Sequence, residues 1–219
     1  VDIVELLANT SLFRSLDNQT MALVLASHRR IKLKRGDEIF HENDLADSLY
    51  IVTSGRIAIL KAFLDRKESM VAIMETGDLF GELGLFDGQG RSATARAIER
   101  SEVAAISYTP IRSAIEHRPV LLWSLLELLA NRLRQTDDAL TDAMFLDVTG
   151  RTAKRLLELA ANLDEFIIPL TQEELAGLIG ASRERVNKTL AAFVRAGYID
   201  INDRLYRIKN RPQLEIIAG

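Results

Sequence analysis

Cysteine is absent from the 219-residue sequence, so the chain can form no disulfide, no thiolate zinc site and no cysteine-ligated iron–sulfur cluster. Histidine is scarce as well. The three histidines lie far apart, without the spacing of metal ligands: His28, His41 and His117. A zinc or haem sensor is therefore disfavoured, although folding can gather distant residues, and we expect no bound metal.

Long apolar runs are also missing. No uninterrupted stretch approaches the roughly 20 residues that a membrane-spanning helix requires. The first residues show no basic segment followed by an apolar one, as a secretory signal would. We therefore expect a cytoplasmic protein with no membrane partner. No Walker loop, nucleophile elbow or metal cluster is visible, so we do not expect an enzyme.

An excess of positive charge is lacking too, since the net charge is −3. From Leu146 onward, 11 basic and 10 acidic residues give a net charge of +1, and the preceding part, with 17 and 21, has −4. Any contact with nucleic acid must therefore come from a local patch and not from bulk charge. The length suffices for one large or two modest domains, each with its own core.

The spacing of apolar residues changes along the chain. Residues 1–27 carry them at helical spacing, which fits two or three short helices. From Arg30 the period becomes two, and turn signals separate the segments. Many short strands at regular spacing predict a compact antiparallel roll or barrel. The strands are expected at residues 31–34, 38–40, 48–52, 56–60 and 70–74.

The most informative stretch is Phe80-Gly81-Glu82-Leu83-Gly84-Leu85-Phe86, followed by Arg91-Ser92-Ala93-Thr94-Ala95. It predicts a strand, a short helix opening at Gly81, a loop and another strand. The amides at a helix start favour an anion, and an Arg with a Ser can hold a phosphate. A carboxylate such as Glu82 accepts from a ribose hydroxyl, so together these groups describe a nucleotide site. The alternative is a surface turn closed by a Glu–Arg pair.

Two helices are predicted next. Thr109 and Pro110 suit the N-cap and first turn of one helix, and a longer helix runs from about Pro119 to Phe145. Its apolar stripe has heptad spacing, which is typical of two helices packed along their length. The stripe either packs on its own domain or forms a homodimer seam, and its length favours the dimer. Its members are Leu122, Leu126, Leu129, Leu133, Thr136, Leu140 and Ala143.

The C-terminal part predicts two short helices joined by a glycine turn. Thr171 and Glu174 form a capping-box pattern, Gly180 suits a left-handed turn and Ser182 suits the N-cap of a second helix. This is helix-turn-helix geometry, with residue types that read base edges exposed at the start of the second helix. The alternative is a charged, solvated helix face. A hairpin, or wing, follows around Asn202-Asp203, and residues 213–217 suit a final helical turn.

Residues 80–95, together with Gly180-Ala181-Ser182-Arg183-Glu184, resemble the cyclic AMP receptor protein family of bacterial transcription regulators. The resemblance covers nearly the whole chain, although the missing cysteines exclude the family's redox-sensing branch. It implies an α+β fold, with an antiparallel β-roll of the jelly-roll type, a long dimerisation helix and a C-terminal winged helix-turn-helix. The implied domains are residues 1–109, 110–145 and 146–219, and Phe145–Arg151 resembles the family's hinge.

The same resemblance implies the ligand site. Arg91 and Ser92 hold the cyclic phosphate of cyclic AMP, and Glu82 takes the ribose hydroxyl. Thr136 lies over the purine, and Asp137 reaches the nucleotide held by the other subunit, at a position where a small hydroxyl is usual. A carboxylate accepts from the adenine amino group, so we expect cyclic AMP to bind more tightly than cyclic GMP. The full expected set is Gly81, Glu82, Leu83, Arg91, Ser92, Ala93, Thr136 and Asp137.

For DNA, the resemblance implies a palindrome with TGTGA-like halves. Arg183, Glu184 and Lys188 read bases, although Lys188 stands where close relatives often have Arg. The expected phosphate contacts are Thr171, Ser182 and Arg185. RNA polymerase is the implied protein partner, but residues 161–170 are shorter than the loop that contacts it in the best-known member, so the polymerase surface stays open.

The sequence thus predicts a homodimeric transcription regulator that responds to a cyclic nucleotide. One rival is a regulatory subunit or channel module that uses the same roll, against which the helix-turn-helix argues. The other is a constitutive DNA binder with a vestigial pocket, against which the complete set of Glu82, Arg91 and Ser92 argues.

Overall fold

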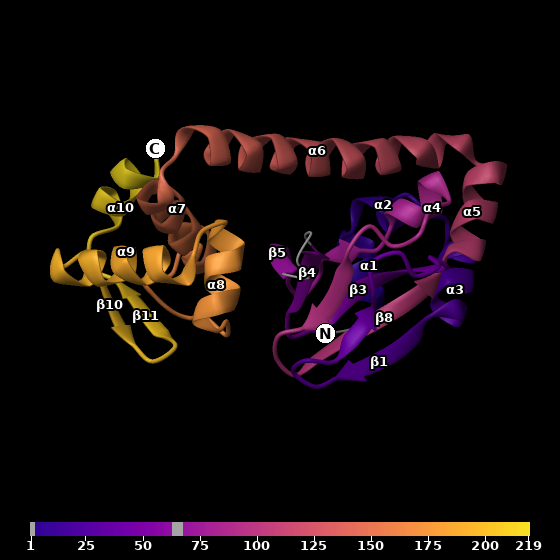
Figure 1. Ribbon diagram of the computed structural model, residues 1–219. Helices are drawn as coiled ribbons and strands as arrows, with labels where there is room; N and C mark the ends of the chain where they lie inside the picture. The colour runs from indigo at the N-terminus through magenta and orange to yellow at the C-terminus, as the bar shows by residue number, and fades with distance from the viewer. Residues whose placement is uncertain (1–2, 63–67) are drawn as a thin grey trace. The chain divides into compact units, whose positions relative to one another are not determined.

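The computed structural model describes residues 3–62 and 68–219. The chain divides into two compact units, residues 1–134 and 135–219 (Figure 1). The first two residues of the predicted N-terminal helical segment lie outside the described ranges.

Three short helices open the first unit, as predicted: α1 (Ile3–Asn9), α2 (Ser11–Arg14) and α3 (Asn18–Ser27). Leu7 and Phe13 are fully buried in a core that these helices share with one of the two sheets of the β-roll. The Asp17 carboxylate caps α3 by accepting from the Thr20 amide at 2.8 Å, and it pairs with Arg118 at 2.6 Å. The Thr20 amide and the Arg118 guanidinium lower the pKa of Asp17 to about 2.

Two four-stranded antiparallel sheets form the predicted β-roll. One sheet has the order β1-β8-β3-β6 and the other β2-β7-β4-β5. Residues from both sheets form one buried cluster, which includes Phe40, Tyr50 and Phe80. The rings of Tyr50 and Phe80 are stacked at a centroid distance of 5.3 Å. The strands are β1 (Arg29–Leu33), β2 (Glu38–Phe40), β3 (Ser48–Ser54), β4 (Ile57–Ala62), β5 (Glu68–Met74), β6 (Leu79–Phe80), β7 (Thr94–Ala97) and β8 (Ser101–Ser107).

Strand β8 was not predicted, although it lies in the middle of its sheet between β1 and β3. Its inner residues, from Val103 to Ile106, are all buried, so the sequence shows no alternation of polar and apolar residues there. A strand covered on both faces lacks the period-two signal on which the prediction depends.

Three helices follow the roll: α5 (Tyr108–His117), the short 3-10 helix η1 (Pro119–Leu121) and α6 (Leu122–Phe145). The prediction that Thr109 caps α5 was wrong. The N-cap is Ser107, whose hydroxyl accepts from the Thr109 amide at 3.3 Å, so Thr109 already lies inside the helix. Pro110 nevertheless stands in the first turn, where its missing N–H costs nothing.

Helix α6 is the long helix that the sequence predicted, and it has two different apolar faces. Leu125 is buried in the core of the first unit, 3% exposed. Four leucines of the heptad stripe are instead 46% to 62% exposed in the single chain: Leu122, Leu126, Leu133 and Leu140.

The second unit has a small helical core and a three-stranded sheet of order β10-β11-β9. The predicted helix boundaries hold for the helix-turn-helix: the capping box of Thr171 and Glu174 is present, Gly180 has φ +70°, and Ser182 caps the second helix. The β9 strand was not predicted. The elements are α7 (Val148–Ala160), β9 (Glu165–Ile167), α8 (Gln172–Ile179), α9 (Arg183–Arg195), β10 (Ile199–Asn202), β11 (Leu205–Ile208) and α10 (Arg211–Ala218).

The turn between β3 and β4 requires a glycine at position 55. Gly55 has φ +76°, and a Cβ there would lie 2.6 Å from the carbonyl oxygen of Arg100. We expect Gly55→Ala to lower the free energy of unfolding by about 3 kcal/mol or more, because backbone strain and a backbone clash add. Urea titration followed by circular dichroism measures this change.

Gly36→Ala is the matched control, since Gly36 has φ +91° but no atom within 4 Å of a Cβ. It should cost only about 1 to 2 kcal/mol, the penalty of the left-handed backbone alone. Equal losses of unfolding free energy in the two variants would show that the contact with Arg100 is not the reason why position 55 requires glycine.

Candidate functional site

The loop between β6 and helix α4 (Leu83–Asp87) brings the backbone close to Arg91. Gly81 has φ +75°, and a Cβ there would lie 2.8 Å from Arg91 Nη1, so the position favours glycine on both counts. The prediction that the helix opens at Gly81 was wrong by two residues, because Glu82 is the N-cap and α4 begins at Leu83.

The Arg91 side chain is buried, with 4% of the residue exposed. Its guanidinium carbon lies 4.3 Å from the Phe40 ring centroid and 5.3 Å from that of Tyr50. Nη1 donates to the carbonyl oxygen of Gly81 at 2.9 Å and to the Tyr108 hydroxyl at 3.2 Å. Nη2 lies 3.9 Å from the carboxylate of the exposed residue Asp47.

Within the described residues, Arg91 Nε is buried and has no hydrogen-bond partner. A buried donor without an acceptor costs about 1 to 3 kcal/mol. Stacking on two aromatic rings offsets part of the cost of burying the charge, because ring faces attract cations, but it supplies no acceptor for Nε. Arg91 therefore has unused capacity to bind an anion.

A cavity of about 60 Å³ lies beside this guanidinium. Six of the predicted ligand-site residues, which we call the cassette, line it: Gly81, Glu82, Leu83, Arg91, Ser92 and Ala93. The fold therefore brings them together from both sides of the 84–90 segment. The lining residues are Phe40, Ile59, Phe80, Gly81, Glu82, Leu83, Gly84, Arg91, Ser92, Ala93 and Arg132.

Glu82 is almost fully buried, 2% exposed, and faces the cavity together with Arg132 from α6. Arg132 Nε lies 3.4 Å from Glu82 Oε1, and Arg132 Nη2 donates to the carbonyl oxygen of Leu79. The cavity thus holds a carboxylate and two guanidinium groups, a donor and acceptor set that suits an anionic ligand with hydroxyl groups.

Arg132 was missed in the sequence because its partner lies 50 positions away. A signal was present, since Arg132 precedes Thr136 by four residues and residues at this spacing share one helix face. Thr136 and Asp137 lie on α6 within the second unit, and both are exposed. Their contact with a ligand stays a prediction.

Helix α5 holds the cassette in place through Tyr108 and Arg112. The Tyr108 hydroxyl donates to the carbonyl oxygen of Gly81 while it accepts from Arg91. Arg112 Nη2 donates to the carbonyl oxygens of Gly84 and Leu85, at 3.3 Å and 3.2 Å. Burial raises the pKa of Tyr108, so its hydroxyl keeps its proton at neutral pH and can donate.

The second unit presents a polar surface along the first turns of α9. Arg183, Glu184, Arg185 and Lys188 are exposed, whereas Val186 and Leu190 are buried against the rest of the unit. Arg185 and Lys188 also line a groove of about 430 Å³ with residues 147–149 at the start of α7. Arg151 lines it as well, and because three cations outweigh the single carboxylate of Asp147, which caps α7, the groove is favourable for phosphate.

Thr171 and Ser182 are engaged as helix caps. The Thr171 hydroxyl accepts from the Glu174 amide at 3.1 Å, and the Ser182 hydroxyl accepts from the Arg185 amide at 3.4 Å. Each hydroxyl keeps its own proton, which it can still donate to a phosphate oxygen.

Two family models match the chain, one in each unit. The Cyclic nucleotide-binding domain matches residues 30–118. The Crp-like helix-turn-helix domain matches residues 150–217. Among the described residues, no group of three or more His, Asp or Glu side chains lies where it could hold a metal ion, and no helix combines the length and apolarity that crossing a bilayer requires.

Known proteins resemble the chain over nearly its full length. The CRP-like cAMP-activated global transcriptional regulator of Mycobacterium tuberculosis is 36% identical over 96% of this chain and 97% of its own. The Cyclic AMP receptor protein of Thermus thermophilus is 32% identical, over 94% and 96%. The solved structure of the c-di-GMP responsive global regulator CLP of Xanthomonas campestris is 26% identical, with a TM-score of 0.74 over 88% of this chain and 99% of that one.

The chain therefore belongs to the cyclic AMP receptor protein family, and the family predicted from residues 80–95 and 180–184 is confirmed. It is a cyclic-nucleotide-responsive, DNA-binding transcription regulator with an α+β fold, as these matches and the two units show.

The contacts of Tyr108 predict a role in positioning Arg91. In Tyr108→Phe, Arg91 Nη1 and the Gly81 carbonyl lose a shared hydroxyl, so we expect cyclic nucleotide affinity to fall by about 3-fold to 10-fold, the effect of one neutral hydrogen bond. Isothermal titration calorimetry measures the affinity. Tyr198→Phe, a change in the second unit, should leave it unaltered, and a Tyr108→Phe variant that binds like the wild type would contradict this role.

Proposed function

We propose that this protein is a homodimeric regulator controlled by cyclic AMP, which binds a DNA palindrome with TGTGA-like halves. The observation that carries the proposal is the Arg91 guanidinium, buried and with an unused donor, in a cavity shared with Glu82. Residues 1–109 act as the nucleotide-binding roll, residues 110–145 as the dimerisation segment and residues 146–219 as the DNA-binding domain.

In this proposal the cassette binds the sugar and the cyclic phosphate. Arg91 and Ser92 hold the phosphate, with Gly81, Leu83 and Ala93 forming the surrounding wall, and Glu82 accepts from the ribose hydroxyl. Ligand pockets typically measure about 300 to 1,000 Å³, far above the cavity beside Arg91, so this cavity accommodates only part of the nucleotide. Because Arg132 pairs with Glu82, its guanidinium competes with the ribose hydroxyl for that carboxylate.

The base is held by Thr136 and Asp137 of α6. The Asp137 carboxylate accepts from the adenine amino group, which is why we propose cyclic AMP over cyclic GMP. The relative from Mycobacterium tuberculosis, whose name describes it as cAMP-activated, supports this choice. The c-di-GMP responsive relative shows that the effector differs within structures of this fold.

Homodimerisation is supported by the stripe on α6. Its leucines are about half exposed in a single chain, whereas Leu125 on the same helix packs into its own unit. An exposed heptad stripe of this length packs well against a second copy of itself. The dimer would place two α9 helices to read two half-sites, which a palindrome requires.

On DNA, Arg183, Glu184 and Lys188 contact base edges, and Arg185, Ser182 and Thr171 contact phosphates. Arg and Lys pair with guanine, and Glu accepts from the cytosine amino group. RNA polymerase is the proposed protein partner. Nucleotide increases DNA affinity only if it binds the DNA-competent state more tightly, because a ligand with equal affinity for both states shifts no equilibrium.

Arg91→Gln tests the ligand assignment. Losing a charged donor pair to a buried phosphate should weaken cyclic AMP binding about 100-fold or more in calorimetry, and cyclic AMP should bind the wild type more tightly than cyclic GMP. Arg96→Gln is the control, because Arg96 lies on β7, five residues after Arg91, but is paired with Glu38 at 2.6 Å and Glu68 at 2.7 Å. Its nucleotide affinity should stay within about twofold of the wild-type value. Loss in both variants, or in neither, would contradict the assignment.

DNA affinity tests the function itself. A palindromic TGTGA-type duplex, titrated at stated salt with and without each nucleotide, should bind most tightly with cyclic AMP. In Lys188→Ala, affinity for this palindrome should fall by about 1 to 3 kcal/mol, and discrimination against a mismatched half-site should weaken. Failure to bind any palindrome would favour a regulatory module, and binding that ignores nucleotide would favour a constitutive regulator.

A further inference from the structure

We propose that Arg151 and Lys154 of α7 lock the C-terminal end of α6 to the turn of the helix-turn-helix. The end of α6 and helix α9, which carries the proposed base-contacting residues, would then move as one rigid body. The inference rests on the proposed function, since such a lock would carry a movement of α6 to the DNA-contacting residues. All of the contacts lie within the second unit.

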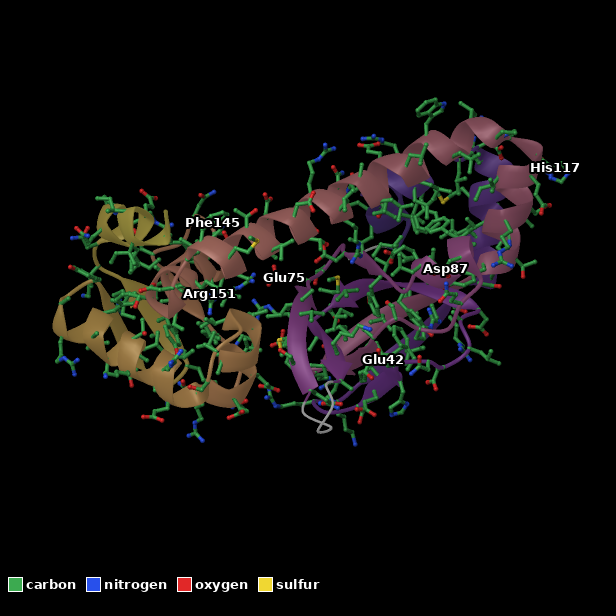
Figure 2. All side chains as sticks on the ribbon, turned by 45° about the horizontal axis from the view of Figure 1, so that its top comes forward. Glu42, Glu75, Asp87, His117, Phe145 and Arg151 are labelled. Carbon is green, nitrogen blue, oxygen red and sulfur yellow. The ribbon has the colours of Figure 1, made fainter. Side chains whose placement is uncertain are left out.

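Arg151, which is labelled in Figure 2, donates to three backbone carbonyl oxygens at the ends of two helices. Its Nη1 lies 2.7 Å from the oxygen of Leu146, just past the end of α6. Its Nε and Nη2 lie 3.1 Å and 3.3 Å from the oxygens of Ile179 and Gly180, at the end of α8. One planar guanidinium therefore joins the end of the long helix to the first residue of the helix-turn-helix turn.

The chemistry of helix ends explains this position. The last carbonyls of a helix have no partner within the helix, and the helix dipole makes its C-terminal end favourable for a cation. Two C-terminal ends meet at Arg151, and a guanidinium carries enough donors to serve both. A neutral side chain at position 151 would leave three carbonyls to solvent and remove the charge that both dipoles favour.

Lys154 adds a second link one turn further along α7. Its Nζ lies 2.6 Å from Asp142 Oδ1 on α6, and both side chains are partly buried, 35% and 22% exposed. Asp147 caps α7 by accepting from the Gly150 amide at 2.8 Å, which fixes the sharp bend between the two helices.

Close packing stiffens the bend between α6 and α7. A Cβ at Gly150 would lie 3.3 Å from Leu146 Cβ and 3.1 Å from the carbonyl oxygen of Ile217, so α7, α10 and the residue that follows α6 approach one another here. A bend held by a cap, an ion pair, a three-way guanidinium contact and tight packing has few ways to yield. A movement imposed on α6 would then reach α9 undiminished.

The test compares coupling, defined as the ratio of DNA affinities with and without saturating cyclic AMP, in full-length variants. In Arg151→Gln, which loses three hydrogen bonds, the ratio should fall about tenfold or more, and in Lys154→Met about 2-fold to 5-fold. Cyclic AMP affinity measured without DNA should change less than twofold in both. Arg151→Lys should restore part of the ratio, because the cation at the helix ends returns.

Arg155→Met is the matched control. It removes the same charge from the same helix, but Arg155 pairs with Glu158 within α7 and not with α6. Its coupling should stay within twofold of the wild type. The lock is refuted if Lys154→Met and Arg151→Gln leave the ratio unchanged, or if Arg155→Met lowers it equally. Should Arg151→Gln not fold, the comparison of Lys154→Met with Arg155→Met decides.

Amide hydrogen exchange separates the lock from the proposed function. Amides of residues 142–146 and 179–181 should exchange at least several-fold faster in Arg151→Gln and Lys154→Met than in the wild type, because the lock holds both helix ends closed. Unchanged exchange would overturn the lock whatever the DNA results. A wild type that binds DNA without regard to nucleotide would overturn the proposed function alone.

Discussion

The cassette depends on the buried positive charge of Arg91, whose hydrogen-bond donors are not all paired within the described residues. Arg91 is buried under Phe40 and Tyr50 and keeps one donor without an acceptor. A buried, incompletely paired cation is destabilising unless something else balances it. The surrounding fold is arranged to tolerate it: Gly81 leaves room, Tyr108 fixes one edge of the guanidinium, and Glu82 supplies the nearby negative charge. A bound phosphate would complete this arrangement.

Local signals were enough to predict much of the fold. The capping box at Thr171, the left-handed Gly180 and the Ser182 cap all act within a few residues, so the helix-turn-helix could be placed from the sequence to the residue. The signals that failed depend on distant partners. Strand β8 is buried on one face by the core shared with the helices and on the other by the core between the two sheets. Ser107, and not Thr109, caps α5, and Arg132 meets Glu82 only after folding. Sequence spacing carries no information about such contacts.

Helix α6 makes contacts both at the candidate ligand site and with helix α7 of the second unit. Near its start Leu125 packs in the first unit, Arg132 pairs with Glu82, and near its end Asp142 pairs with Lys154. The half-exposed leucines run along the helix from Leu122 to Leu140, and they form the surface on which the proposed dimer depends. A ligand that competes with Arg132 for Glu82 therefore acts on α6, the helix that the proposed lock joins to the helix-turn-helix. Helix ends, which leave carbonyls unpaired, are natural places for such a joint, and Arg151 uses two of them.

Whether the Arg91 guanidinium receives the cyclic phosphate can be followed in solution through the NMR resonance of Arg91 Nε–H. The resonance is assigned by its absence in Arg91→Lys and followed as cyclic AMP is added. We expect a saturable shift as the proton gains an anionic acceptor. An Arg91 resonance that stays unmoved while the protein is saturated with nucleotide would show that Arg91 does not bind the phosphate.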